Sequence, residues 1–133
     1  MAIERSNPEG LHPVSGYHHV TVAAPGRLVF LAGQCPVRPD GTVPAEDDLT
    51  EQVRVTTGNC LLALASAGAT PGDVVRAVVY VVASERDVLR AVWGLLMKSD
   101  LREAFSSAST LLGVTQLGFA GQRVEVELTA ALP

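Results

Sequence analysis

Residues 74–82 form an almost unbroken run of apolar, mostly β-branched side chains (VVRAVVYVV). Strands with one face in water alternate apolar and polar residues, so a continuous run indicates a strand that is buried on both faces. The turn sequence Thr-Pro-Gly at residues 70–72 precedes the run. We therefore expect a buried strand to begin just after this turn.

A helix is predicted on each side of this strand, because two segments begin with a capping-box pattern. In such a box, side chains three residues apart bond to the free N–H groups at the helix start. Residues 48–51 (DLTE) begin the first helix, which we expect to run to about Ala67 and to end at Gly68. Residues 84–87 (SERD) begin the second, which we expect to end near Lys98.

Four further segments have the apolar patterns of strands. Residues 20–24 and 28–32, joined by a Pro-Gly turn, are predicted to form a hairpin. Residues 109–114 and 124–132 are predicted to form two more strands. The order is β-β-α-β-α-β-β, which favours a single α+β domain with one mixed sheet and both helices on one face.

The predicted last strand shows what the other face of this sheet carries. Apolar and polar side chains alternate along it, so they point to opposite faces. Val124, Val126, Leu128 and Ala130 form one face, whereas Arg123, Glu125, Glu127 and Thr129 form the other. A face of this mixed character, with no helix to cover it, is expected to meet solvent or another subunit.

The start of the chain and its charge bound the remaining possibilities. Residues 1–16 hold two prolines and two glycines and show little periodicity, so we expect an N-terminal arm before a domain of residues 17–133. The net charge of −4 argues against nucleic-acid binding, which needs a basic surface. No segment reaches the ~18 apolar residues of a membrane span, and no signal peptide is evident. We expect a cytoplasmic protein without nucleic-acid or membrane partners.

Cysteine and histidine give no sign of a metal site. Cys35 and Cys60 form no CxxC pair, and no basic residue near Cys35 in the sequence would lower its pKa. His18 and His19 are neighbours on a predicted strand and point to opposite faces, so they do not bind one metal ion together. We expect an inert thiol at Cys35 and no metal.

One set of segments matches a known protein family in order and in spacing. These segments are residues 28–36 (LVFLAGQCP), 52–64 (QVRVTTGNCLLAL), 67–69 (AGA), 74–81, 109–114 and 124–127 (VEVE). Together they resemble the Rid (reactive-intermediate deaminase, YjgF-like) family, and Tyr17 stands where that family has a tyrosine before its first strand.

The resemblance implies a chorismate-mutase-like α+β fold. It also implies a homotrimer in which the uncovered sheet faces pack around a central barrel, with ligand clefts between neighbouring subunits. Family members hydrolyse imines and enamines of 2-oxo acids to the oxo acid and ammonia, without a metal or organic cofactor. Some members carry an endoribonuclease label, which the acidic charge and the lack of a histidine acid/base pair argue against here.

The family positions transfer only in part. The family arginine, whose guanidinium holds the substrate carboxylate, corresponds to Ala108, and a family serine corresponds to Ala32. The glutamate that orients the attacking water corresponds to Glu125, and Tyr17 is also retained. The resulting candidates are Glu125 and Tyr17 as catalytic residues, and Ala32, Gly33, Gln34, Arg90, Ala108, Ser109 and Thr110 as ligand-binding residues.

Three functions remain open at this point. The first is an atypical Rid protein that binds or acts on a small molecule other than a simple 2-imino acid. The second is a 2-iminobutanoate or 2-iminopropanoate deaminase whose arginine has moved to Arg90 or Arg123. The third is a non-enzymatic scaffold or regulatory oligomer. The plainer alternatives are that Arg90 is a surface helix residue, that Arg123 forms an ion pair with Glu125, and that Glu125 is solvated or packed against a subunit.

Overall fold

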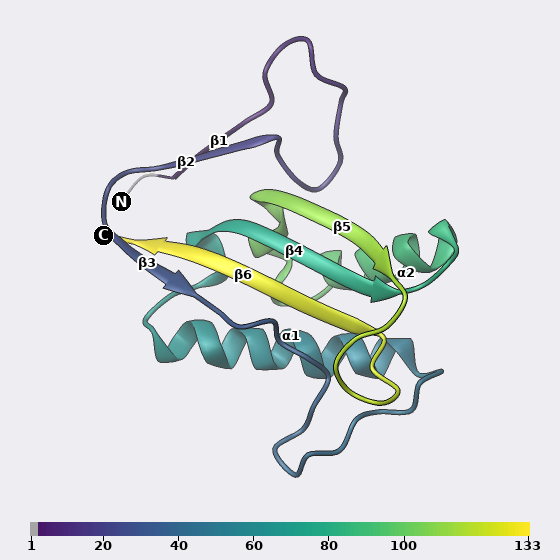
Figure 1. Cartoon of the computed structure of the whole chain (residues 1–133). Coiled ribbons are helices and arrows are strands. Elements are labelled where there is room, and N and C mark those ends of the chain that lie inside the picture. The colour runs from purple at the N-terminus through teal and green to yellow at the C-terminus, as the bar shows by residue number, and fades with distance from the viewer. Residues whose placement is uncertain (1–2) are drawn as a thin grey trace.

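Strand β4 (Val74–Val82) lies inside a four-stranded sheet of order β3-β6-β4-β5 in the computed structural model, which describes residues 3–133 (Figure 1). β4 pairs in parallel with β5 (Ala108–Val114) and antiparallel with β6 (Val124–Leu132). β6 also pairs antiparallel with β3 (Arg27–Phe30). The sheet is therefore mixed, as predicted.

Two helices, α1 (Leu49–Ser66) and α2 (Arg86–Met97), cover one face of this sheet (Figure 1). Leu64 of α1 and Leu96 of α2 are fully buried in the same apolar core as Val79 of β4. Burial of each such side chain contributes about 1.5–3 kcal/mol. This arrangement is the α+β, chorismate-mutase-like fold that the resemblance implies. Neither helix combines the length and the apolar character needed to cross a membrane, nor does any other helix among residues 3–133.

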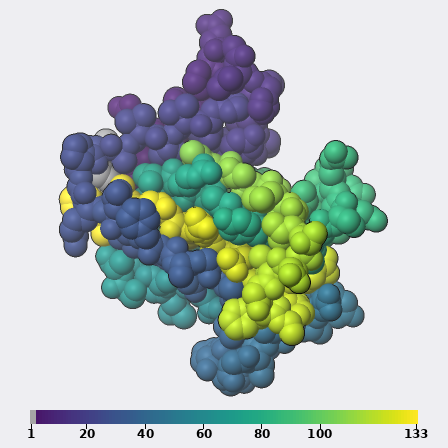
Figure 2. All heavy atoms as spheres, viewed as in Figure 1, coloured from purple at the N-terminus to yellow at the C-terminus, as the bar shows by residue number. Residues whose placement is uncertain are grey.

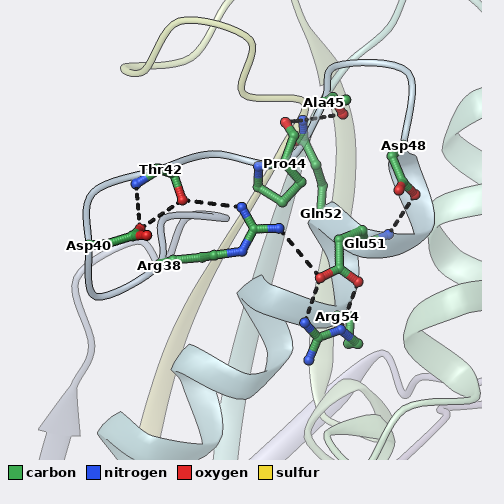
Figure 3. Close-up of polar contacts among 9 residues, drawn as sticks. All are labelled: Arg38, Asp40, Thr42, Pro44, Ala45, Asp48, Glu51, Gln52 and Arg54. Carbon is green, nitrogen blue, oxygen red and sulfur yellow. Dashed lines mark hydrogen bonds and ion pairs between the residues drawn. The ribbon is translucent and has the colours of Figure 1, made fainter.

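The ends of α1 lie where the sequence predicts, but only half of its predicted capping box forms. Asp48 accepts a hydrogen bond from the backbone N–H of Glu51 at 3.1 Å (Figure 3), whereas the Glu51 carboxylate pairs with Arg54 and Arg38 and does not reach back to the backbone of Asp48. Gly68 ends the helix with a positive φ of 77°.

The capping box predicted at residues 84–87 does not form. The N-cap residue of α2 is Glu85, and no side chain caps the helix there. Asp87 instead pairs with Arg90 one turn further on, at 2.9 Å.

The predicted hairpin of residues 20–32 is wrong. β2 (Val20–Ala23) pairs with β1 (Ile3–Ser6), a strand inside the expected arm, and the two form a separate sheet. The chain turns between β2 and β3 at Gly26, where a Cβ atom would collide with the carbonyl oxygen of Leu132. β3 therefore pairs with β6 and does not form a hairpin with β2.

The N-terminal segment is fastened to the domain in two places. The guanidinium of Arg5 donates to the carbonyl of Gly72 at 2.9 Å, just before β4. Further along, the N–H of His18 donates to the carbonyl of Ser107 at 3.3 Å, and His18 forms a parallel bridge with Ala108 at the start of β5. In the space-filling view this segment rests against the atoms of β5 (Figure 2).

The second face of the sheet is uncovered in this chain. Along β4, Val79 and Val81 are buried against the helices, whereas Val78 and Tyr80 are only half-buried. The expectation that this strand is buried on both faces is therefore wrong for a single chain, because no element of residues 3–133 forms a second layer of helices. We call this surface the open face; it carries residues 28 and 30 of β3, 125, 127 and 129 of β6, 76, 78 and 80 of β4, and 108, 110 and 112 of β5.

The loop between β3 and α1 is held by polar side chains (Figure 3). Arg38 forms an ion pair with Glu51 in the first turn of α1, at 3.6 Å. Asp40 accepts a hydrogen bond from the backbone N–H of Thr42 at 3.0 Å, which closes the turn expected at Asp40-Gly41. These contacts place the loop beside the start of α1 and the turn that precedes β6.

Candidate functional site

An open groove of about 470 Å³ runs along the outer edge of β5. Its walls are aromatic and hydroxyl-bearing, and the rings of Tyr17 and Trp93 meet edge to face at 6.2 Å between centroids. Phe105 packs behind Trp93 at 5.8 Å, which fixes the indole. The groove is lined by Tyr17, Trp93, Ser109, Thr110 and Leu111.

Backbone pairing places Tyr17 at this edge. His18, the next residue, pairs with the start of β5, and the N–H of Ala108 donates to the Thr21 hydroxyl at 2.9 Å. Among residues 3–133 no hydrogen bond engages the Tyr17 hydroxyl or the Trp93 indole N–H. The groove therefore offers an aromatic surface with polar groups at its margin, a surface suited to a planar or apolar ligand.

Glu125 lies in a second cluster, between β6 and the segment that follows β3. Its Oε1 atom accepts hydrogen bonds from the Cys35 thiol and from the side-chain amide of Gln122, both at 3.1 Å. The carboxylate packs directly on Gly33, where a Cβ atom would overlap Oε2. Gly33 thus permits a close approach that no other residue allows, and Oε2 receives no hydrogen bond from the described residues.

Gln34 anchors the same segment to the sheet. Its N–H donates to the carbonyl of Val126 at 2.7 Å, and it accepts from the N–H of Val126 at 3.0 Å. Ala32, two residues earlier, is exposed. The segment from Ala32 to Cys35 therefore continues alongside β6 as a narrow extension of β3 that presents Gly33 to Glu125.

Two buried glutamines, which the sequence analysis did not identify as site residues, fix the turn before β6. Gln122 is 3% exposed; its Oε1 accepts from the N–H of Phe119 and its Nε2 donates to the Val124 carbonyl at 3.0 Å. Gln52 on α1 is fully buried, accepts from the N–H of Arg123 at 2.7 Å and donates to the Gly121 carbonyl at 2.8 Å. Figure 3 shows Gln52 beside Pro44 and Ala45, whose carbonyls it also contacts. Each satisfied buried amide favours one position for this turn and so for Glu125.

The thiol of Cys35 is a donor to the carboxylate. Burial raises the pKa of Cys35 most, and the hydrogen bond to Glu125 and the negative charge of that side chain raise it further, to about 12. A thiol with this pKa is protonated at neutral pH and is a poor nucleophile. Burial likewise raises the pKa of Cys60 to about 12. These values agree with the inert thiol expected at Cys35.

Tyr17 and Glu125 do not come together within one chain. Tyr80 on β4 lies between Glu125 on β6 and Leu112 on β5 in the sheet register. Glu125 is therefore two strand spacings, about 10 Å, from β5 and its groove. Thr110 and Ala108 share the open face with Glu125, whereas Ser109 lies on the helix side of β5.

Neither candidate replacement arginine lines the groove. Arg90 pairs with the exposed carboxylate of Asp87 and borders a different groove, beside the loop before α2. Arg123 donates to the backbone carbonyls of Val82 at 3.0 Å and Glu46 at 3.2 Å. The ion pair considered between Arg123 and Glu125 is absent among residues 3–133.

A different arginine, which the sequence analysis did not consider, lies next to Ala108. Arg76 on β4 is the register partner of Ala108 on β5, so both side chains point to the open face. Its guanidinium donates to the hydroxyl of Thr110, a groove residue, at 3.3 Å. No local signal in the sequence marks this neighbourhood, because it depends on the pairing of two distant strands.

The histidines contact backbone carbonyls. His18 Nδ1 lies against the carbonyl of Ser106, and His19 Nε2 lies 2.9 Å from that of His12. Within the described part of the chain, no group of three or more His, Cys, Asp or Glu side chains is placed to hold a metal ion.

Residues 8–132 match a protein family described as Endoribonuclease L-PSP. Similar solved structures include the Rid-family protein YyfB from Yersinia pestis, of unknown function, which is 30% identical with a TM-score of 0.85 over 99% of this chain and 100% of that one. Rv2704 from Mycobacterium tuberculosis, a member of the YjgF/YER057c/UK114 family, is 26% identical with a TM-score of 0.64 over 98% and 100%. TdcF from E. coli, solved with bound serine, is 24% identical with a TM-score of 0.65 over 96% and 94%, which shows the fold alone. No curated protein sequence matches the chain.

The family match spans almost the whole domain, and the likeness to YyfB covers it entirely. The mixed sheet, with both helices on one face, agrees with the fold that the sequence resemblance implies. The chain therefore belongs to the endoribonuclease L-PSP family, the family of the Rid (YjgF-like) proteins.

Proposed function

We propose that this protein is an atypical Rid protein, a cytoplasmic homotrimer whose clefts between subunits bind a small molecule other than a simple 2-imino acid. The observation that carries the proposal is the make-up of the groove. Its lining residues are aromatic, hydroxyl-bearing or aliphatic, and alanine stands at position 108, which the sequence resemblance assigns to the family arginine.

Without an arginine at position 108, the groove lacks a group at that position that would hold the carboxylate of a small substrate. A guanidinium holds a carboxylate through two charge-assisted hydrogen bonds in a fixed geometry. Losing such a contact costs about 3 kcal/mol, or roughly a hundredfold in affinity. For a 2-imino acid of three or four carbons the carboxylate is the main binding group. Alanine at position 108 therefore disfavours such a substrate, and the ligand must gain its affinity from the aromatic walls instead.

The position of Glu125 supports a cleft built from two subunits. Oε1 is already engaged by Cys35 and Gln122, so Oε2 is the atom that would orient a water molecule or accept from a ligand. In one chain that atom is too far from Tyr17 for both to touch a small ligand. The groove along β5 is open on its outer side, and a neighbouring subunit that supplies its own Glu125 there would complete the site.

The open face supports the trimer. Phe30 and Leu28 on β3 are 73% and 57% exposed, and they lie side by side with Thr129 and Ala131 of β6. Large exposed apolar side chains grouped on an uncovered sheet face are typical of a subunit interface. Burying them in the barrel would remove this apolar surface from water.

Two measurements test the proposal. Sedimentation equilibrium at micromolar concentration should give a trimer, and a stable monomer would contradict the assembly. Calorimetric titration with 2-oxobutanoate, the product of the simple reaction, should show no saturable binding. Saturable binding would instead favour the deaminase with a relocated arginine, the alternative considered from the sequence.

A further inference from the structure

Arg76 stands one strand away from the position of the family arginine. Its register partner on β5 is Ala108, and paired residues of neighbouring strands point to the same face. The guanidinium therefore projects from the sheet about 4.8 Å to the side of the position that an arginine at residue 108 would occupy. It contacts the hydroxyl of Thr110, which lines the groove.

The guanidinium retains most of its donors. Its one hydrogen bond among residues 3–133 is to Thr110, and no carboxylate of those residues lies within ion-pair distance. Glu127, which also lies on the open face, accepts a hydrogen bond from the Tyr80 hydroxyl at 3.0 Å. Six other arginines are engaged, since Arg38, Arg54 and Arg90 pair with carboxylates and Arg5, Arg102 and Arg123 donate to backbone carbonyls. Arg27 and Arg86 form neither kind of contact among residues 3–133, but neither of them contacts a residue that lines the groove.

We infer that Arg76, which is not itself a lining residue but contacts one through Thr110, is the anion-binding residue at the margin of this groove, and that the ligand is a monocarboxylic acid with a planar apolar body. The carboxylate would lie on Arg76 and the Thr110 hydroxyl, with the body against Tyr17 and Trp93. This inference rests on the proposed function, because it names the ligand class of the same cleft. An acid of three or four carbons held on Arg76 is too short to fill the aromatic part of the groove as well.

The test uses tryptophan fluorescence, because Trp93 is the sole tryptophan of the chain and lines the groove. The probes are 3-phenylpropanoate, its neutral amide and butanoate, titrated against the wild-type protein and against variants. In the wild type, 3-phenylpropanoate should bind at least about tenfold more tightly than either the amide or butanoate. Only this probe combines the charge-assisted hydrogen bonds from the Arg76 guanidinium to its carboxylate with contact between its phenyl ring and the aromatic walls.

The variants test whether the positive charge, the two-pronged hydrogen bonding of the guanidinium and the position of the arginine each matter. Arg76→Ala should abolish the preference for the acid over the amide without weakening the amide, and Arg76→Lys should keep part of it. Arg27→Ala, which removes an exposed arginine from the opposite edge strand β3, should leave the preference unchanged. If Arg76→Ala changes the sedimentation coefficient, Arg76→Gln, which keeps a long polar side chain, replaces it.

The outcomes distinguish a failure of the inference about Arg76 and its ligand from a failure of the proposed function. A preference for the acid that survives in Arg76→Ala would overturn the role of Arg76 while leaving the proposed cleft intact. No preference for the acid in the wild type, or no response to either phenyl probe, would overturn the ligand class. A monomer in sedimentation, or saturable 2-oxobutanoate binding, would instead count against the proposed function itself.

Discussion

Replacing Gly33 by alanine should destabilise the protein through one side chain, Glu125. The new Cβ atom would lie 2.7 Å from Cδ and 3.0 Å from Cγ of Glu125, and closer still to Oε2, so the carboxylate must move. It would then lose its hydrogen bonds to Cys35 and Gln122. Bonds to a charged group contribute about 1.5–3 kcal/mol each. Because a thiol is a weak donor and Glu125 is only half-buried, we expect a loss of about 2 kcal/mol.

The backbone at Gly33 does not contribute to this cost, because its φ lies outside the positive region that favours glycine. In a Glu125→Ala background the same substitution should therefore be neutral or stabilise by about 0.4–1 kcal/mol, by restricting the unfolded chain. Urea unfolding of the four proteins in this cycle measures the coupling. Gly58→Ala is the control: no atom lies within 4 Å of the added Cβ on α1, so about 0.5–1 kcal/mol of stabilisation is expected. An equal loss from Gly33→Ala in both backgrounds would refute the reasoning.

Two further predictions concern the thiol and the open face. Glu125→Gln should lower the pKa of Cys35 from about 12, because the carboxylate charge is removed, while burial keeps that pKa above 9.0; the pH dependence of iodoacetamide alkylation measures this, and an unchanged profile would contradict it. If the proposed trimer forms through the open face, replacing Leu28 and Phe30 together by serine should weaken it at least about tenfold in sedimentation equilibrium, because large apolar side chains would no longer be buried between subunits. Leu62→Ser is the matched control, since Leu62 is 72% exposed on α1; a trimer unaffected by the double substitution would show that the interface lies elsewhere.

Patterns that span only a few residues of the sequence predicted most of the helices and strands of the domain. The alternation along residues 124–132 gave the two faces of β6, because side chains of a strand repeat every two residues. Asp48 and Gly68 gave the ends of α1, since caps act on the backbone next to them. The cap predicted for α2 failed because the N-cap position falls on Glu85, one residue after the predicted Ser84, and no side chain caps the helix there.

Features that depend on distant pairing were missed. β1 has the sequence IERS, which carries no apolar alternation, and it forms a strand because β2 pairs with it and Arg5 bonds to the Gly72 carbonyl. The predicted hairpin failed for the same reason. Within the candidate site, the family resemblance pointed to Tyr17 and Glu125.

The sequence did not predict what surrounds these candidates. Cys35 and Glu125 are 90 residues apart along the chain, and Arg76 and Thr110 are 34 apart. Such contacts follow from the register between strands and from which loop lies beside which strand. No periodicity within a single segment contains that information, so Arg76 was identified only once β4 and β5 were paired.

Turnover of 2-iminobutanoate tests the central claim most directly. Ammonia release should be measured side by side for the wild type, for a Rid protein that has the family arginine, and for the double variant Ala32→Ser/Ala108→Arg. We predict that the wild type is slower than the arginine-bearing protein by roughly a hundredfold, as the loss of about 3 kcal/mol implies, and that the double variant recovers part of the difference. Wild-type turnover equal to that of the arginine-bearing protein would contradict the account.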